Sequence, residues 1–165
     1  MSRDPLADPA PLIRRVYAYV AYRVGDGPEA EDITSDTFER ALRYRANYDP
    51  RKGTPTAWLM GIARRSIADA LGRRSGDVPF DEWLAADPAA LGSAESVDAG
   101  RADLHDALKR LDPRTRDLLA LRYGADLTSR EIGALLEMRA NTVDVAIHRA
   151  LEELRRALSS SSGSG

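Results

Sequence analysis

The stretch TSREIGALLEMRANTVDVAIHRALEELRRAL, residues 128–158, decides the fold. Thr128 and Glu131 have the spacing of a capping box, which predicts the start of a short helix. After a four-residue joint, Asn141 is expected to cap a second helix, in which apolar residues recur every three or four positions as far as Leu158. A short helix, a tight joint and a longer helix have the spacing of a helix-turn-helix.

A helix-turn-helix presents the first turns of its second helix to the major groove of DNA. The candidate contacts are Arg139, Asn141, Thr142, Asp144, Val145, His148 and Arg149. Two residues argue against a DNA-binding helix-turn-helix. Glu137 stands where the turn usually has glycine, and Asp144 places an anion near the phosphates. Asp144 is therefore interpreted as a specificity device. The pattern alone also fits an αα-hairpin within a helical bundle.

The remainder of the sequence is helical in pattern as well, and no strand pattern occurs. Helices are expected over residues 11–24, 28–45, 55–71, 104–111 and 113–123. The prediction is an all-α fold of two small helical domains, at 11–74 and 102–158, joined by a flexible acidic linker at 75–101. Residues 1–10 are expected to be a disordered lead-in and residues 159–165 a disordered Ser/Gly tail.

Charge divides the chain in the same way. The net charge is +3 over residues 1–75, −6 over residues 76–103 and +1 over residues 104–165, for a total of −2. This balance argues against a protein that wraps nucleic acid with a wholly basic surface. The absence of cysteine excludes disulfides and thiolate metal sites, and no apolar run is long enough to cross a membrane. A cytoplasmic, nucleoid-associated protein is expected.

Two charged surfaces are candidates for binding in the first domain. The helix from residue 28 carries a charged stripe made of Asp32, Asp36, Glu39, Arg40 and Arg43, which is either solvated surface or a protein-docking face. The loop and the following helix offer Asn47, Tyr48, Asp49, Arg51, Lys52, Thr54, Arg64 and Arg65. These residues fit an ordinary basic face or a single-stranded DNA site, with Tyr48 available to stack on a base. Trp58 is interpreted as core.

Catalysis has little support in the sequence. His105 and His148 are the two histidines, they lie far apart, and no glycine-rich phosphate loop occurs. His105 is expected to be an exposed helix residue. No enzyme activity, cofactor, metal or small-molecule substrate is predicted.

Three segments together resemble one family. Residues 29–42 (EAEDITSDTFERAL), 56–69 (TAWLMGIARRSIAD) and 142–150 (TVDVAIHRA) look like the extracytoplasmic-function (ECF) sigma factors of bacterial RNA polymerase. The segments occur in the family's order, and residues 113–123 resemble the helix that precedes the family's C-terminal helix-turn-helix. One departure is Asp144, where the family commonly has a basic residue.

The resemblance implies a transcription initiation factor that binds core RNA polymerase and promoter DNA. Residues 11–74 would be region 2, whose charged helix docks on the polymerase and whose loop captures unpaired bases of the minus-10 element. Residues 102–158 would be region 4, which reads the minus-35 element as duplex. An anti-sigma factor is a further expected partner.

Two other interpretations of the sequence remain. The first is a self-sufficient dimeric helix-turn-helix regulator in which residues 11–74 dimerise. The second is a helical adaptor that binds only protein, which the acidic isoelectric point near 5.7 would suit.

Overall fold

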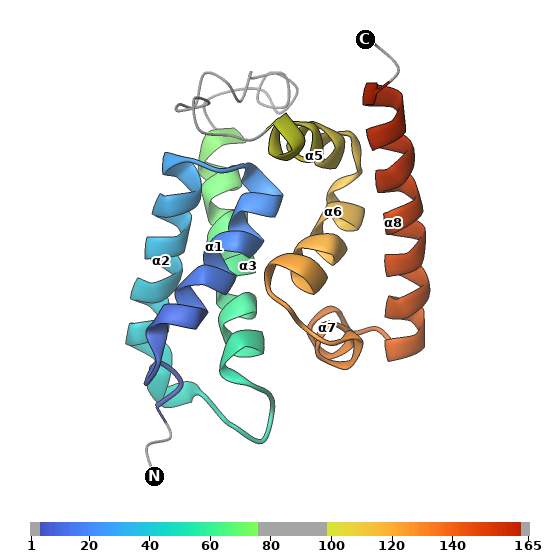
Figure 1. Cartoon of the computed structure of the whole chain (residues 1–165). Helices are drawn as coiled ribbons and strands as arrows, with labels where there is room; N and C mark the ends of the chain where they lie inside the picture. The colour runs from blue at the N-terminus through green and yellow to red at the C-terminus, as the bar shows by residue number, and fades with distance from the viewer. Residues whose placement is uncertain (1–3, 76–98, 163–165) are drawn as a thin grey trace.

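The computed structural model describes residues 4–75 and 99–162, and every regular element within them is helical (Figure 1). The elements are α1 (Pro9–Val24), α2 (Pro28–Tyr44), the 3₁₀ turn η1 (Arg45–Asn47), α3 (Pro55–Ser75), α5 (Ala99–Arg110), α6 (Pro113–Leu119), the π-helical turn η4 (Ala120–Gly124), α7 (Ser129–Leu136) and α8 (Ala140–Ser162). We call residues 4–75 the N-terminal half and residues 99–162 the C-terminal half. The all-α fold predicted from the sequence is confirmed.

Helix starts at prolines follow from local chemistry. Pro28, Pro55 and Pro113 each open a helix, where the missing N–H of proline has no intrahelical acceptor to lose. Asp112 caps α6 by accepting the Thr115 N–H at 2.9 Å. The capping box of Thr128 and Glu131 is formed as the sequence predicted.

The N-terminal boundaries differ from the sequence prediction in two places. α1 begins at Pro9 instead of Pro11, because both prolines fit in the first turn, so the disordered lead-in predicted over residues 1–10 is too long. Asp4 also organises the preceding turn, accepting the Leu6 N–H at 3.0 Å. α3 continues to Ser75, about one turn beyond the expected end. Most of the linker predicted over residues 75–101 lies outside the described residues.

The last helix corrects two further predictions. Asn141 does not cap α8: the helix starts at Ala140, and the Val143 N–H bonds to the Arg139 carbonyl at 3.0 Å, so Asn141 already lies in the first turn. The predicted disordered tail is wrong over residues 159–162, which continue α8. There the Ser160 hydroxyl donates to the Arg156 carbonyl at 2.9 Å.

Each half buries its apolar stripes internally. In the N-terminal half, α1, α2 and α3 pack on one another and bury residues such as Val16, Ile33 and Leu59. In the C-terminal half, α5, α6 and α7 all pack against α8, which lies along the outer edge of the molecule (Figure 1). Leu108 of α5 and Leu119 of α6 belong to a second, smaller cluster of buried residues.

The two halves also share one hydrophobic core. A single cluster of buried residues includes Val16 and Leu59 from the first half and Leu121, Ile132 and Ile147 from the second. The two halves meet most extensively between α1 and η4, where a Cβ added to Gly124 would lie 3.0 Å from the Tyr19 backbone. The chain therefore folds with its two helical units in direct contact.

In the turn of the helix-turn-helix, the position that requires glycine is not the one expected from the sequence. Glu137, where the sequence suggested a need for glycine, adopts the left-handed conformation at φ 57° and ψ 48°. The glycine needed for close packing is Gly133, one turn earlier, since a Cβ there would lie 2.4 Å from the Met138 carbonyl oxygen. The Met138 N–H also donates to the Gly133 carbonyl at 2.8 Å.

We expect Gly133→Ala to lower the free energy of unfolding by about 1–3 kcal/mol, because the added methyl group must push the backbone of the turn away. Gly72→Ala is the matched control: its Cβ meets no atom within 4 Å, so the higher helix propensity of alanine should stabilise α3 by up to ~1 kcal/mol. Urea denaturation followed by circular dichroism measures both. Equal effects of the two substitutions would contradict the close packing at Gly133.

His105 lies at the contact between the two halves, so the prediction that it is an exposed helix residue is wrong. It lies half-buried on α5 against the turn between α1 and α2, where a Cβ on Gly25 would approach its Cε1 to 2.7 Å. Gly25 also has φ +95°, so glycine is needed there for two reasons. Burial and the nearby charges of Lys109 and Arg116 lower the pKa of His105, against opposing effects of Asp106 and Asp26.

A lowered pKa in the folded chain means that the unfolded chain binds the extra proton more readily as pH falls. The contribution of His105 to stability is therefore fully present above its unfolded pKa of about 6.5 and is lost as pH falls through the folded pKa. We expect His105→Gln to reduce the loss of thermal stability between about pH 7.5 and about pH 5.5, whereas His148→Gln, at an exposed position, should not. Identical melting curves against pH for the two variants would contradict this role of His105.

Candidate nucleic-acid interface

The first turns of α8 form an open surface. Val143, Ile147 and Ala150 are buried and face the rest of the C-terminal half. The predicted reading residues, which lie just before Val143 or between these buried positions, are all solvent-exposed: Arg139, Asn141, Thr142, Asp144, Val145, His148 and Arg149. Val145 is 52% exposed, which is unusual for an aliphatic side chain, and His148 pairs with Glu152 at 3.4 Å. The helix-turn-helix thus presents a preformed face of the size and shape that enters a major groove.

Asp144 is held by its own protein. The Ser129 hydroxyl at the start of α7 donates a hydrogen bond to Asp144 Oδ1. Arg122 supports Ser129, since its Nη1 donates to the Ser129 hydroxyl oxygen at 3.2 Å and to the Leu127 carbonyl at 3.4 Å. The carboxylate is therefore oriented before any DNA arrives. Ser129 was not among the residues singled out from the sequence, because the bond joins two helices.

The loop of residues 47–54, which we call the 47–54 loop, is braced from within. The Tyr48 hydroxyl donates to the Gly53 carbonyl at 2.8 Å, and the Tyr48 ring meets Trp58 edge-on with 5.4 Å between centroids. Burial and Asp49 raise the pKa of Tyr48. Asp49 pairs with Arg51 at 3.2 Å, although the Arg51 side chain is 90% exposed.

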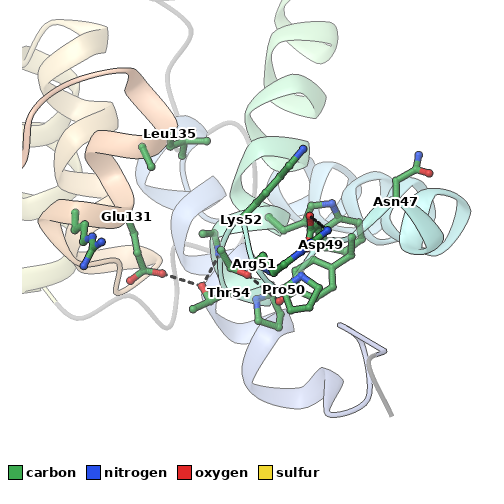
Figure 2. A pocket seen from close by; sticks show the side chains of 15 residues that line it. Asn47, Asp49, Pro50, Arg51, Lys52, Thr54, Glu131 and Leu135 are labelled. Atoms are coloured by element: carbon green, nitrogen blue, oxygen red, sulfur yellow. Dashed lines mark hydrogen bonds and ion pairs between the residues drawn. The ribbon is translucent and has the colours of Figure 1, made fainter. Parts of the chain in front are cut away.

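The loop borders a groove whose other wall is α7. The groove has a volume of about 670 Å³, and its lining includes Lys52, Trp58 and Leu135 (Figure 2). At its edge the Thr54 hydroxyl donates to Glu131 Oε2 at 2.8 Å, a bond between the two halves drawn in Figure 2. Burial raises the pKa of Glu131, but hydrogen bonds from Thr128 and Thr54 outweigh it, so the pKa lies below its usual value. No pattern in the sequence indicates this hydrogen bond, because Thr54 and Glu131 are 77 positions apart.

The charged stripe of α2 lies on the surface as expected. Asp32, Glu39 and Arg43 are exposed, while Asp36 is partly buried. Arg40 joins the stripe to α3, pairing with Asp36 at 3.1 Å and with Asp69 at 2.8 Å. The face is thus held rigidly while its outer carboxylates remain open to a partner.

Arg64 and Arg65 have different surroundings despite being neighbours on α3. Arg65 is exposed. Arg64 points towards the C-terminal half, where its Nη2 lies 3.2 Å from Asp117 Oδ2, and its buried Nε has no hydrogen-bond partner. Sequence analysis placed both on one basic surface, and the structure separates them.

Asp117 of α6 is the centre of this second contact. The Tyr19 hydroxyl donates to its Oδ1 at 2.5 Å and Arg23 Nη1 donates to the same oxygen at 2.8 Å. Burial and the adjacent Asp117 carboxylate raise the pKa of Tyr19, so its hydroxyl remains a donor at neutral pH. The sequence held one signal of this site: Asp117 lies four residues before the apolar Leu121, which places it on the apolar side of a helix.

No helix among residues 4–75 and 99–162 is both long and apolar enough to cross a membrane. In the same part of the chain, no three histidine or carboxylate side chains are grouped so that they could hold a metal ion.

The described residues combine an exposed helix-turn-helix with a second, charge-striped helical unit, an arrangement that is typical of DNA-binding proteins. The Sigma-70 region 2 family model matches residues 11–76, and the Sigma-70 region 4 model matches residues 101–154. The chain belongs to the ECF RNA polymerase sigma factors. The helix-turn-helix is thus region 4, and the three-helix unit is region 2.

Similar proteins from several bacteria are sigma factors as well. The chain is 34% identical over 146 residues to the RNA polymerase sigma factor CarQ of Myxococcus xanthus, covering 87% of this chain and 83% of CarQ. It is 33% identical over 147 residues to the ECF RNA polymerase sigma factor BldN of Streptomyces coelicolor, covering 87% of this chain but 56% of BldN. The chain therefore spans little more than half the length of some relatives.

Two solved structures share the fold. The sigma factor RpoE in complex with the anti-sigma factor NepR, from Bartonella quintana, aligns with a TM-score of 0.72 at 19% identity, over 90% of this chain and 92% of that one. CnrH in complex with the cytosolic domain of CnrY aligns with a TM-score of 0.60 at 19% identity, over 94% and 85%.

We expect Ser129→Ala to release Asp144 and to change the preference of the polymerase-bound chain among minus-35 duplexes in the same direction as Asp144→Ala. The double variant should differ little from either single variant, because both changes break the same contact. Ser160→Ala removes a hydroxyl elsewhere on the surface and serves as the control. Competition between duplexes measures the preference, and additive effects of the two substitutions would show that Ser129 does not act through Asp144.

Proposed function

We propose that the chain is a transcription initiation factor that binds core RNA polymerase and directs it to promoters, with no catalytic step of its own. The observation that carries the proposal is that one chain contains both sigma regions, with the α2 stripe and the α8 reading face each open to solvent. The site of action is the bacterial cytoplasm, at the nucleoid.

The polymerase-docking face is the α2 stripe of Asp32, Asp36, Glu39, Arg40 and Arg43. Its exposed carboxylates suit a basic partner, and the pairing of Arg40 with Asp69 fixes the helix beneath them. Exposed carboxylates held on a helix both speed the encounter with a basic partner and help to select it.

The minus-10 site is the 47–54 loop with the arginines of α3, and it acts on unpaired DNA. Asn47, Arg51, Lys52, Thr54 and Arg65 are exposed and can contact backbone or base edges. Tyr48 and Asp49 belong to the proposed site as well, and they also hold the loop in shape, since the Tyr48 hydroxyl donates to the Gly53 carbonyl and Asp49 pairs with Arg51.

The minus-35 site is the exposed face of α8. Thr142 and Val145 offer a methyl group to thymine, Asn141 can pair with adenine, and Arg149 can reach guanine or phosphate. Asp144, held by Ser129, repels phosphates and can accept only from an amino group such as that of cytosine, so it favours selectivity over general affinity.

An anti-sigma factor is included among the proposed partners. One structure that shares the fold, over 90% of this chain, is a complex of the sigma factor RpoE with the anti-sigma factor NepR. The rival interpretation as a dimeric regulator would have to dimerise residues 11–74 through α2, because α1 and α3 already pack against α6, η4 and α7 of the same chain.

The direct test is co-purification with core RNA polymerase followed by transcription from promoter DNA. We expect the chain to bind the core enzyme and to make transcription depend on a specific promoter, while the free chain binds duplex weakly because its net charge is −2. Tight sequence-specific binding to duplex without polymerase would refute the proposal.

We expect Asp32→Arg combined with Asp36→Arg to weaken binding to core polymerase by on the order of tenfold or more, through charge repulsion at the docking face. Asp103→Arg combined with Asp106→Arg makes the same change of charge on the exposed surface of α5 and should leave binding unaltered. Affinity is measured by titration of labelled core enzyme, with helicity checked by circular dichroism. Equal affinity of both double variants would remove α2 from the interface.

A further inference from the structure

We propose that the groove between the 47–54 loop and α7 is a binding site for a small aromatic carboxylic acid. The ring of the ligand would lie against Trp58, and its carboxylate would pair with Lys52 and Arg130. The site goes beyond the surfaces proposed for polymerase and DNA, because it takes a small molecule. An effect of this ligand on transcription rests on the proposed function, whereas the binding itself does not.

The groove has the volume of a small-molecule site. It holds about 670 Å³, within the range of roughly 300–1,000 Å³ that is typical of ligand pockets. One wall is the 47–54 loop together with the start of α3, and the other is the segment of α7 from Arg130 to Leu135 (Figure 2). Because α3 and α7 also pack on each other, the groove exists before any ligand arrives.

Much of the lining is apolar. Trp58 and Leu135 are partly buried, and Ala134 of α7 is exposed towards solvent. Tyr48 meets Trp58 edge-on with 5.4 Å between ring centroids, which helps to fix the orientation of the indole. An aromatic ring placed beside this pair gains both apolar burial and favourable offset or edge contacts. The groove therefore favours a flat, apolar ligand body.

The polar groups of the loop are already bonded within the protein. The Tyr48 hydroxyl donates to a backbone carbonyl of the loop at 2.8 Å, and the Thr54 hydroxyl donates to Glu131 at 2.8 Å. Asp49 pairs with Arg51 at 3.2 Å. A nucleobase carries several polar edge groups, and each costs free energy when it is buried without a partner. A ligand body without such edges fits this groove better than a base does.

Two cations give the groove its charge complementarity. Lys52 and Arg130 line it from opposite walls, and both are exposed. Among residues 4–75 and 99–162 neither side chain forms an ion pair, unlike Arg51 with Asp49. Glu131 also lines the groove, but hydrogen bonds from two threonine hydroxyls occupy its carboxylate. A carboxylate between the walls would meet two cations, one of them a guanidinium that can bind it through two N–H groups.

A bound acid would compete with single-stranded DNA for one side of the loop. Lys52 belongs to the proposed minus-10 site, so a ligand carboxylate paired with it removes a contact to phosphate. Arg130 lies on α7 and is not among the proposed DNA contacts. The ligand would therefore lower promoter-directed transcription without touching the polymerase-docking face on α2.

Nuclear magnetic resonance of the full chain tests the site, with β-naphthoate as the probe. The sequence contains two tryptophans, Trp58 and Trp83, so Trp83→Phe leaves Trp58 with the one indole N–H signal. We expect β-naphthoate to shift this signal saturably, with a Kd near or below about 1 mM. The neutral β-naphthamide has the same ring without the charge, and it should bind on the order of tenfold more weakly.

Substitutions locate the probe in the groove. Arg130→Gln should weaken binding of β-naphthoate by on the order of fivefold, whereas Arg155→Gln removes an exposed cation from α8 and should not. Ala134→Phe fills the groove and should abolish the shift of the Trp58 signal. Ala68→Phe is its matched control, because it adds the same ring at an exposed position of α3. Circular dichroism checks the helicity of each variant.

Three results would overturn the proposal. They are a Trp58 signal that does not move at millimolar probe, equal affinity for the acid and the amide, and binding that persists unchanged in both Arg130→Gln and Ala134→Phe. Cytidine monophosphate represents the other occupant, an aromatic anion with polar edges. Tighter binding of the nucleotide than of β-naphthoate would assign the groove to a DNA base and refute the site for a small acid.

Transcription with core polymerase is measured separately. We expect β-naphthoate to inhibit the wild-type chain more than Arg130→Gln, whose rate without the probe should match the wild-type rate because Arg130 lies outside the proposed DNA contacts. Equal inhibition of the two chains would show that the acid acts elsewhere and would overturn the inference. Absence of promoter-directed transcription from either chain would count against the proposed function alone, and the binding measurements would still decide the inference.

Discussion

The buried carboxylate of Asp117 determines how the two halves of the chain meet. Apolar packing between α1 and η4 supplies attraction but little direction, because the hydrophobic effect depends on area. A buried charge must be satisfied by particular atoms, and Tyr19, Arg23 and Arg64 provide them. Such a site selects one orientation, since a small rotation of α6 would leave one anion and two cations without partners in a medium of low dielectric constant.

The features predicted correctly from the sequence are those fixed by residues close together in the chain. Pro28 and Pro55 open helices, and Thr128 with Glu131 forms a capping box, because each depends on one turn of backbone. Asn141 shows the limit of local signals: Arg139 supplies the carbonyl for the first turn, and the helix begins one residue before the expected cap.

The features that were missed join residues distant in sequence. His105 meets Gly25 and Asp144 meets Ser129 only after the helices have packed, so no periodicity in one segment could reveal them. The same holds for the 47–54 loop, whose Thr54 donates a hydrogen bond to Glu131, 77 positions further along the chain. Exposed faces were easier to predict from the sequence, because the outward stripe of α8 follows from the helical spacing of its buried residues.

The two proposed nucleic-acid surfaces differ in a way that suits the form of DNA that each would bind. Duplex DNA presents a regular groove, so a rigid helix with a fixed carboxylate can select among sequences without rearranging, and the bond from Ser129 to Asp144 provides that rigidity. A single strand has no fixed shape and must be captured by separate contacts to bases and phosphates. Cations that serve such capture attract any anion, including the chain's own carboxylates. Arg64 is paired with Asp117 of the C-terminal half, so the cations open to such capture are Arg51 and Lys52 in the loop and Arg65 on α3, which are all exposed.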